Sequence, residues 1–277
     1  MRITILIDNR PTSGLESEHG LCLLVETKTH KILVDTGLSG KAFDNAEKLG
    51  ININDVDLLL LSHGHIDHTG GLRRFLEINQ KAKIIASHHI PDTKYWSNRG
   101  GKFHSLSPDA ALIRNNINRF ILITDNYVIN NDIGIISPKN AHNPKPQGNR
   151  YLFVSDGDKM IPYTASDELA LSVVEDGKLV VISPCSHQGL LNIADNCCNA
   201  MNCSQITAFV GGLHLLDGES DDVTSIASQI NLLYPQMHLY TSHCTGNDAC
   251  TIFQEGLKDR FHVFTTGEGI NIGSFIH

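Results

Sequence analysis

The sequence predicts an α/β fold, because apolar strands and helices alternate along much of the chain. Three observations lead to this prediction. Short apolar runs recur through the 277 residues, helical patterns follow several of them, and a histidine comes at or just after the end of four of the runs. Ligands of an open α/β sheet bind outside the carboxyl ends of its strands, so these histidines mark a candidate site.

The N-terminal third predicts strands and one helix. Residues 2–8 alternate apolar and polar side chains and predict a strand, and the apolar runs 21–26 and 31–35 predict a hairpin. Apolar residues at helical spacing follow them and predict a helix that ends at Gly50. Leu58–Leu61 shows no alternation, which is typical of a strand buried on both faces.

The middle of the chain, about residues 88–165, is less regular and carries several prolines between short apolar runs. We interpret it as an insertion of strands and loops that covers one side of a site. Beyond it, Asp176-Gly177 between two apolar runs predicts a hairpin, and helices are expected at 188–199 and 222–234. No long linker divides the chain, so we expect a single domain over residues 1–277 with this irregular insertion.

Composition excludes some classes of protein. The net charge of −8 argues against a nucleic-acid partner, because a surface that binds phosphates carries a basic excess. No stretch reaches the ~20 apolar residues needed to cross a bilayer, and residues 1–8 lack the apolar region of a signal peptide. The seven cysteines follow no framework spacing and predict free thiols, so we expect a cytoplasmic protein.

One arrangement recurs four times: an apolar strand with a histidine at or just after its end. The strands and their histidines are Leu58–Ser62 with His63 and His65, Leu179–Ser183 with His187, Ile206–Val210 with His214, and Met237–Thr241 with His243. We expect these histidines to gather at one edge of a sheet. Helices that follow such strands point their N-termini at the same place, which favours hydroxide, carboxylate or phosphate.

The segment His63-Gly64-His65-Ile66-Asp67-His68 is the richest of the four. Alternate residues of an extended strand point the same way, so His63 and His65 can hold one ion together. Asp67 and His68 follow as the chain turns and can face a second ion. Neutral imidazole and carboxylate suit zinc, and also iron or manganese. A solvated polar turn is the alternative, but four potential ligands within six residues after a buried strand favour metal binding.

This segment, followed by Thr69-Gly70-Gly71, resembles the metal-binding motif of the metallo-β-lactamase superfamily. Leu33-Val34-Asp35-Thr36-Gly37 is similar to the strand-Asp-x-Gly element whose Asp supports a ligand imidazole there. Four further motifs extend the resemblance along the chain: Glu18-His19-Gly20-Leu21, Pro184-Cys185-Ser186-His187-Gln188-Gly189, Gly211-Gly212-Leu213-His214-Leu215 and Ser242-His243-Cys244-Thr245-Gly246. Together they resemble the subgroup that includes archaeal 7,8-dihydropterin-6-methyl-4-(β-D-ribofuranosyl)aminobenzene-5′-phosphate synthase.

The resemblance implies an α/β fold (α+β by some schemes), an αββα sandwich of two mixed sheets with helices on both outer faces. It also implies zinc as the cofactor, as one or two ions, with iron or manganese as alternatives. The implied ligands of a first ion are His63, His65 and His187, and those of a second are Asp67, His68 and His243. Asp35, His19 and Cys185 are implied to contact the substrate or to support the ligands.

One departure from the superfamily's pattern affects these assignments. Most members carry a histidine before the strand that here begins at Glu168, and a Gly-Asp at the end of the next strand whose Asp bridges the ions. Pro184-Cys185 stands at that second place, and no histidine precedes Glu168 within Tyr163–Glu168. A single ion and two ions bridged only by water therefore both stay open. Cys185 or Cys244 could coordinate metal, although we expect buried or supporting thiols.

The leading functional hypothesis is hydrolysis of an ester, amide or phosphoester in a small molecule, by a metal-bound hydroxide that zinc makes available near pH 7. Asp67 would orient the hydroxide. His214 could protonate the leaving group, bind metal or contact a substrate phosphate. The resemblance also implies a transferase alternative, the condensation of a pterin pyrophosphate with an arylamine. A nuclease, a diiron oxidoreductase and a metal sensor are weaker alternatives, and the oligomeric state is not indicated.

Overall fold

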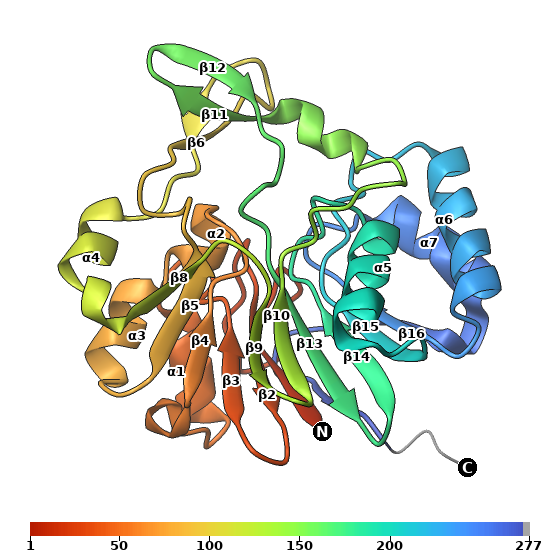
Figure 1. Cartoon of the computed structure of the whole chain (residues 1–277), viewed down its shortest axis with the longest axis horizontal. Helices are drawn as coiled ribbons and strands as arrows, with labels where there is room; N and C mark the ends of the chain where they lie inside the picture. Colours follow the sequence, from red (N-terminus) through yellow and green to blue (C-terminus); the bar gives the residue numbers. More distant parts are fainter. Residues whose placement is uncertain (274–277) are drawn as a thin grey trace. The chain divides into compact units, whose positions relative to one another are not determined.

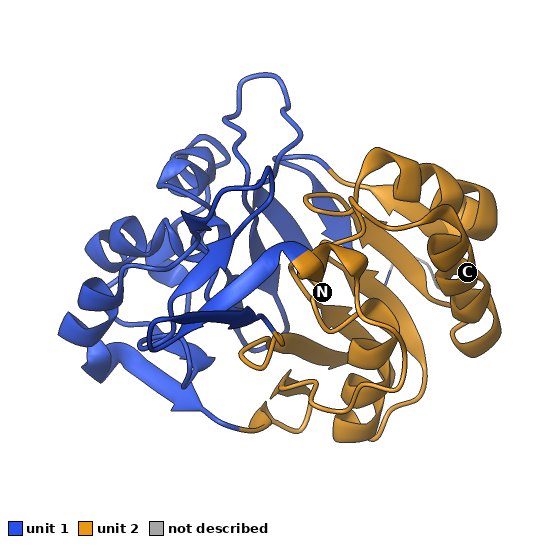
Figure 2. Cartoon of the chain, turned by 90° about the horizontal axis from the view of Figure 1, so that it is seen from above, with its two compact units in different colours: residues 1–124, 151–163, 265–277 blue, residues 125–150, 164–264 orange. Residues whose placement is uncertain are grey.

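The computed structural model describes residues 1–273, which form helices and three β-sheets. Tertiary contacts divide the chain into two compact units, shown in Figure 2. Unit 1 contains residues 1–124, 151–163 and those from 265 onward, and unit 2 contains residues 125–150 and 164–264. The expectation of a single domain stays a prediction beside this division.

Unit 1 is built on a seven-stranded mixed sheet. The strands, in their order across the sheet, are β18 (Gly269–Asn271), β1 (Arg2–Ile7), β2 (Cys22–Glu26), β3 (Lys31–Val34), β4 (Leu58–Leu60), β5 (Lys83–Ser87) and β8 (Phe120–Ile123). Pairing is antiparallel from β18 to β3 and parallel from β3 to β8. The predicted hairpin of β2 and β3 is confirmed, and so is the burial of Leu59, Leu60 and Leu61.

The helices of unit 1 pack on one face of this sheet (Figure 1). They are α1 (Lys41–Lys48), α3 (Leu72–Ile78) and α4 (Ala110–Asn115), with the short α2 (Ile66–Thr69) after β4 and the 3₁₀ turns η1 (Ile53–Asp55) and η2 (Ile117–Arg119). Phe43 and Phe75 bury their rings against strand residues, with ring centroids 6.2 Å apart. Gly50 has φ +71° just after α1, a conformation that favours glycine and explains where this helix ends.

Unit 2 repeats this plan with a second seven-stranded mixed sheet. Its strands, in order, are β17 (Phe261–Val263), β16 (His238–Thr241), β15 (Ile206–Val210), β14 (Lys178–Ile182), β13 (Ala170–Glu175), β10 (Ile133–Ile136) and β9 (Tyr127–Asn130). Pairing is parallel from β17 to β14 and antiparallel from β14 to β9. Asp176 and Gly177 both have positive φ between β13 and β14, so the predicted hairpin is confirmed.

Three long helices bury apolar side chains against this second sheet (Figure 1). They are α5 (Leu190–Met201), α6 (Ser220–Leu233) and α7 (Asn247–Leu257), and the turn η4 (Lys258–Arg260) follows α7. The first two agree with the helices expected at 188–199 and 222–234 to within a few residues at each end. None of the helices among residues 1–273 is long and apolar enough to cross a membrane.

The segment 88–165, expected to be an irregular insertion, supplies strands to all three sheets. It contributes β8 to unit 1, β9 and β10 to unit 2, and a four-stranded sheet in unit 1. The small sheet has the order β12 (Lys159–Pro162), β11 (Leu152–Asp156), β6 (Tyr95–Ser97) and β7 (His104–Ser105), and the turn η3 (Gln147–Tyr151) precedes β11. Several of these strands are only half buried, so they do not show the regular burial pattern that reveals a core strand in sequence.

The predicted α/β fold class is confirmed, with mixed sheets and helices packed against them. The expectation that four histidine-bearing strands share one sheet edge is wrong in part. β14, β15 and β16 are parallel neighbours in unit 2, whereas β4 belongs to the sheet of unit 1. Strand-end patterns do not show sheet membership, because long-range pairing leaves no mark in a local sequence.

Packing of the second sheet gives a stability prediction. Leu239 on β16 is fully buried, and its replacement by alanine leaves a cavity that should lower the free energy of unfolding by about 2–5 kcal/mol. Leu232 on α6 is 78% exposed, so Leu232→Ala is the matched control and should change stability by less than about 0.5 kcal/mol. Urea unfolding followed by circular dichroism measures both, and equal effects of the two variants would contradict the packing described.

Candidate metal centre

The buried carboxylate of Asp35 organises the histidines of unit 1. It follows β3 with φ +60° and is fully buried. One carboxylate oxygen accepts a hydrogen bond from the Ser62 backbone N–H at 2.7 Å, and the other accepts from the Ser62 hydroxyl and from His68 Nδ1, each at 2.7 Å. Asp35 therefore joins the end of β3 to the end of β4 and to α2.

These bonds determine which ring nitrogens of His63 and His68 carry hydrogen. A carboxylate only accepts, so His68 Nδ1 is protonated and its Nε2 is the electron-pair donor. The Ser62 hydroxyl gives its hydrogen to Asp35 and so accepts one from His63 Nδ1 at 2.9 Å. Both imidazoles thus present Nε2 as the nitrogen that can bind a metal, the arrangement by which carboxylates orient metal-binding histidines.

His63 and His65 lie in the geometry of a shared ligand pair. His63 Nε2 and His65 Nδ1 are 3.0 Å apart, and both side chains are buried. Two nitrogens bound to one tetrahedral zinc at about 2.0–2.1 Å are separated by roughly 3.3 Å. The pair therefore fits a common ion after a small adjustment, as the His-x-His spacing predicts.

Asp67 and His19 are neighbours at the start of α2. His19 Nε2 is 3.4 Å from Asp67 Oδ2, and His68 Nε2 is 3.6 Å from the same oxygen. The Asp67 side chain retains 14% exposure, whereas the His19 side chain is 66% exposed. Glu18 holds the loop before α1, because its carboxylate accepts hydrogen bonds from the backbone N–H groups of Leu38 and Ser39 at 3.0 Å each.

Two tyrosines that the sequence analysis did not select enclose His65. The rings of Tyr95 and Tyr163 lie 5.5 Å and 5.1 Å from the His65 ring, measured between centroids. A Cβ at Gly64 would lie 2.3 Å from Tyr95 ring atoms, so only glycine fits at this place in the motif. Tyr95 and Tyr163 belong to the irregular middle segment, where no periodic pattern could single them out.

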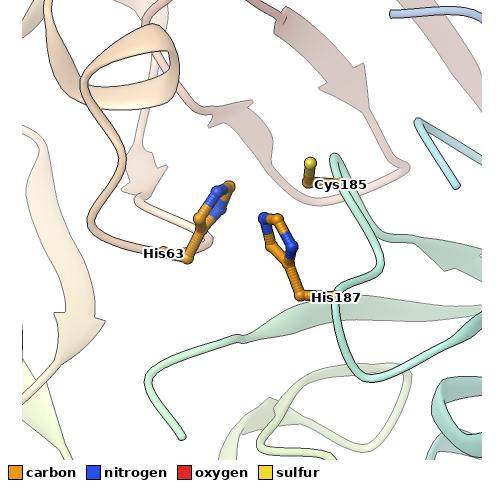
Figure 3. Close-up of side chains that lie close together, drawn as sticks. All are labelled: His63, Cys185 and His187. Atoms are coloured by element: carbon orange, nitrogen blue, oxygen red, sulfur yellow. The ribbon is translucent and has the colours of Figure 1, made fainter. Parts of the chain in front are cut away.

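In unit 2, Cys185 and His187 lie on the loop that follows β14 (Figure 3). Glu168 holds this loop, since its two carboxyl oxygens accept the His187 and Gln188 backbone N–H groups at 2.6 Å each. Burial raises the pKa of the Glu168 carboxyl to about 8, against the opposing effect of these two hydrogen bonds. In the sequence, Glu168 is recognisable only as the start of a predicted strand.

Asn149 orients His187 and was also missed by the sequence analysis. Its side chain donates to the His187 carbonyl at 2.8 Å, and its amide oxygen lies 3.0 Å from His187 Nδ1. The amide oxygen only accepts, so Nδ1 carries the hydrogen and Nε2 is the electron-pair donor. Asn149 thus does for His187 what Asp35 does for His68.

The loops after β15 and β16 carry His214, His243 and Cys244. His214 and His243 have φ +51° and +52°, and such strained residues concentrate at functional sites. The rings of His187 and His214 are 4.2 Å apart. His214 Nε2 is buried, with no hydrogen-bond partner among the residues that the structure describes.

Two thiols lie beside these histidines. Cys185 Sγ is 3.2 Å from Cys244 Sγ and 3.6 Å from His214 Nδ1. Burial raises the pKa of the Cys244 thiol, but the hydrogen bond with Cys185 and the charges of His243 and His214 hold it well below its usual value overall. All seven cysteines are free, in agreement with the sequence.

Each unit therefore brings metal-binding groups together. Ligand atoms of Asp35, His63 and His68 lie within 4.8 Å of one another in unit 1, and those of Cys185, His214 and Cys244 do so in unit 2. Buried imidazoles whose second nitrogen is already hydrogen-bonded are the donors that zinc, iron and manganese take in proteins. The side chains present fit a metal centre.

Comparisons with known proteins agree with this site. Residues 17–160 match the model of the metallo-β-lactamase superfamily. The chain is 27% identical over 266 residues to 7,8-dihydropterin-6-methyl-4-(β-D-ribofuranosyl)-aminobenzene-5′-phosphate synthase of Methanocaldococcus jannaschii, covering 91% of this chain and 89% of that protein.

Two solved structures resemble the fold. A metal-dependent hydrolase of the β-lactamase superfamily superposes with a TM-score of 0.84 at 29% identity, covering 98% of this chain and 99% of that one. The short form of human tRNase Z has a TM-score of 0.56 at 13% identity, covering 98% and 99%, and shares the fold alone.

The chain belongs to the metallo-β-lactamase superfamily. Members of this superfamily generally bind metal ions, and the relatives named above are enzymes. The resemblance inferred from the His63–His68 motif is confirmed.

The Asp35 network gives a prediction about metal affinity. Asp35→Asn keeps the shape of the side chain, but its amide nitrogen must face one of the three donors. We expect metal affinity to fall about 10- to 100-fold, because His63 and His68 lose their orientation. Competition with a coloured chelator measures the affinity, and Asp55→Asn in η1 is the exposed control. Unchanged affinity in Asp35→Asn would contradict this role.

Proposed function

We propose that this protein is a metal-dependent hydrolase that cleaves an ester, amide or phosphoester bond in a small molecule. The observation that carries the proposal is the hydrogen-bond chain from Asp35 through Ser62 to His63, with its branch to His68. This chain aligns two buried imidazoles with Nε2 unprotonated, at the position where the superfamily motif places metal ligands. Burying this many polar groups lowers the stability of the fold unless hydrogen bonds or a bound metal compensate.

The proposed ligands follow superfamily membership. His63, His65 and His187 would hold one ion, and Asp67, His68 and His243 would hold a second. The oriented tautomers of His63, His68 and His187 support these three as ligands. Zinc is the proposed metal, with iron or manganese as alternatives, because imidazole and carboxylate serve all three.

A divalent ion held here supplies Lewis acidity, which polarises a carbonyl or phosphoryl oxygen and makes water acidic enough to react near neutral pH. The remaining roles belong to side chains. Asp67 is a partly exposed carboxylate beside His68, so it can accept a hydrogen bond from the attacking water and orient it. His19 lies next to Asp67 on the exposed side, where it can contact substrate.

Metal binding is the proposed role of His214. Protonation of a leaving group, contact with a phosphate and metal binding were all open. Its Nδ1 faces the Cys185 sulfur, and its Nε2 is buried. This orientation favours metal binding.

A second candidate function is transfer rather than hydrolysis. The observation in its favour is the similarity to the dihydropterin synthase of Methanocaldococcus jannaschii, which extends over 91% of this chain. An amine would then replace water as the nucleophile, and pyrophosphate would leave from a pterin substrate. Pyrophosphate release that requires an added arylamine distinguishes this reaction from hydrolysis. The small-molecule substrate, the cytoplasmic location and the lack of a nucleic-acid partner stay predictions.

Metal removal and two substitutions test the proposal. Purified protein is assayed on a panel of phosphodiesters, esters and lactones, before and after dialysis against a chelator. We expect turnover to disappear on chelation and to return with zinc, manganese or iron. His65→Ala and Asp67→Ala should abolish it, since each removes a ligand. His104→Ala in exposed β7 is the control. Full turnover in metal-stripped protein would contradict the proposal.

A further inference from the structure

We propose that Cys185, His214 and Cys244 of unit 2 form a thiolate-containing metal site that takes a soft divalent ion such as zinc. The inference rests on the proposed metal dependence and adds two sulfur ligands to it. The three side chains come from the loops that follow the adjacent parallel strands β14, β15 and β16. Strand order alone therefore brings them to one sheet edge.

The distances suit a common ion. A tetrahedral zinc with bonds of about 2.3 Å to sulfur and 2.0–2.1 Å to nitrogen separates sulfur from nitrogen by roughly 3.6 Å. The observed separation of Cys185 Sγ and His214 Nδ1 is 3.6 Å. Two sulfurs on such an ion lie roughly 3.8 Å apart. The thiols at 3.2 Å must therefore move apart by roughly half an ångström to admit the ion.

The groups around Cys244 Sγ favour a negatively charged sulfur. The His214 backbone N–H donates to this sulfur at 3.2 Å. A Cβ at Gly212 would lie only 2.6 Å from it, so glycine is required there to make room for the sulfur. A backbone N–H aimed at a sulfur supports a thiolate in the way that supporting hydrogen bonds tune metal ligands.

Cys185 and Cys244 differ from the cysteines that are buried in the apolar core. Cys197 and Cys250 lie in the apolar core of unit 2, and burial raises the pKa of Cys197 to about 12. Thiols of that kind are inert packing residues. Cys185 and Cys244 instead contact each other and an imidazole. The proposed ligand role differs from the expectation, drawn from the sequence, that both are buried or supporting thiols.

Cys185 is the side chain of its loop that can supply an anionic ligand. No carboxylate stands between the end of β14 and His187, where the loop reads Ser183-Pro184-Cys185-Ser186. A thiolate supplies the anionic ligand that this loop otherwise lacks. Sulfur ligands favour zinc, cobalt and cadmium over magnesium and manganese. The proposed site therefore predicts a metal preference as well as a ligand set.

Cobalt substitution tests the inference on the whole protein. The reduced, metal-free chain is titrated with Co²⁺ without oxygen, because thiolate-bound Co²⁺ shows an intense near-ultraviolet charge-transfer band. We expect this band in the wild type, a marked loss in Cys185→Ser and in Cys244→Ser, and complete loss in the double variant. Cys198→Ser and Cys203→Ser change thiols outside the cluster and should leave the band intact.

A second measurement does not depend on any variant. X-ray absorption at the zinc edge of the zinc-loaded wild type should show sulfur neighbours at about 2.3 Å. Nitrogen and oxygen neighbours alone would overturn the inference, as would a Co²⁺ band that survives in the double variant. A Cys185–Cys244 disulfide in freshly prepared protein would overturn it too. In each of these cases metal-dependent turnover, measured separately, still decides whether the hydrolase proposal stands.

Discussion

The buried carboxylate of Asp35 is the constraint on which the rest of the unit 1 site depends. An unpaired carboxylate in a protein interior is costly, and here three donors from Ser62 and His68 satisfy it. The same bonds fix the protonation of two imidazoles and tie β3, β4 and α2 together. One buried carboxylate therefore serves both folding and ligand orientation.

Unit 2 uses a similar device with different residues. Glu168 holds the backbone of the loop after β14, and Asn149 orients the His187 ring on that loop. The acceptor that faces the His187 ring is therefore the neutral amide of Asn149, whereas a carboxylate faces the His68 ring in unit 1. Both units thus position their metal-binding side chains on turns at strand ends, and both orient them with hydrogen-bond acceptors from elsewhere in the same unit.

The local features of the site were predictable because they depend on neighbours in sequence. His63, His65, Asp67 and His68 lie within six residues after an apolar strand, and the alternation of an extended chain determines which of them can pair. Asn149, Tyr95 and Tyr163 were not predictable. They come from short segments whose partners lie far along the chain, and contacts of that kind leave no periodic pattern.

The sequence by itself determined the fold class, the superfamily motif and the ends of most core strands, because burial and turn chemistry act over a few residues. Only the tertiary structure decided that β4 pairs in one sheet while β14, β15 and β16 pair in another. It also decided that Cys185 and Cys244, 59 residues apart, bring their sulfurs within 3.2 Å. The two cysteines meet because their loops follow parallel strands of one sheet. Strand order depends on long-range pairing, which a local sequence pattern does not reveal.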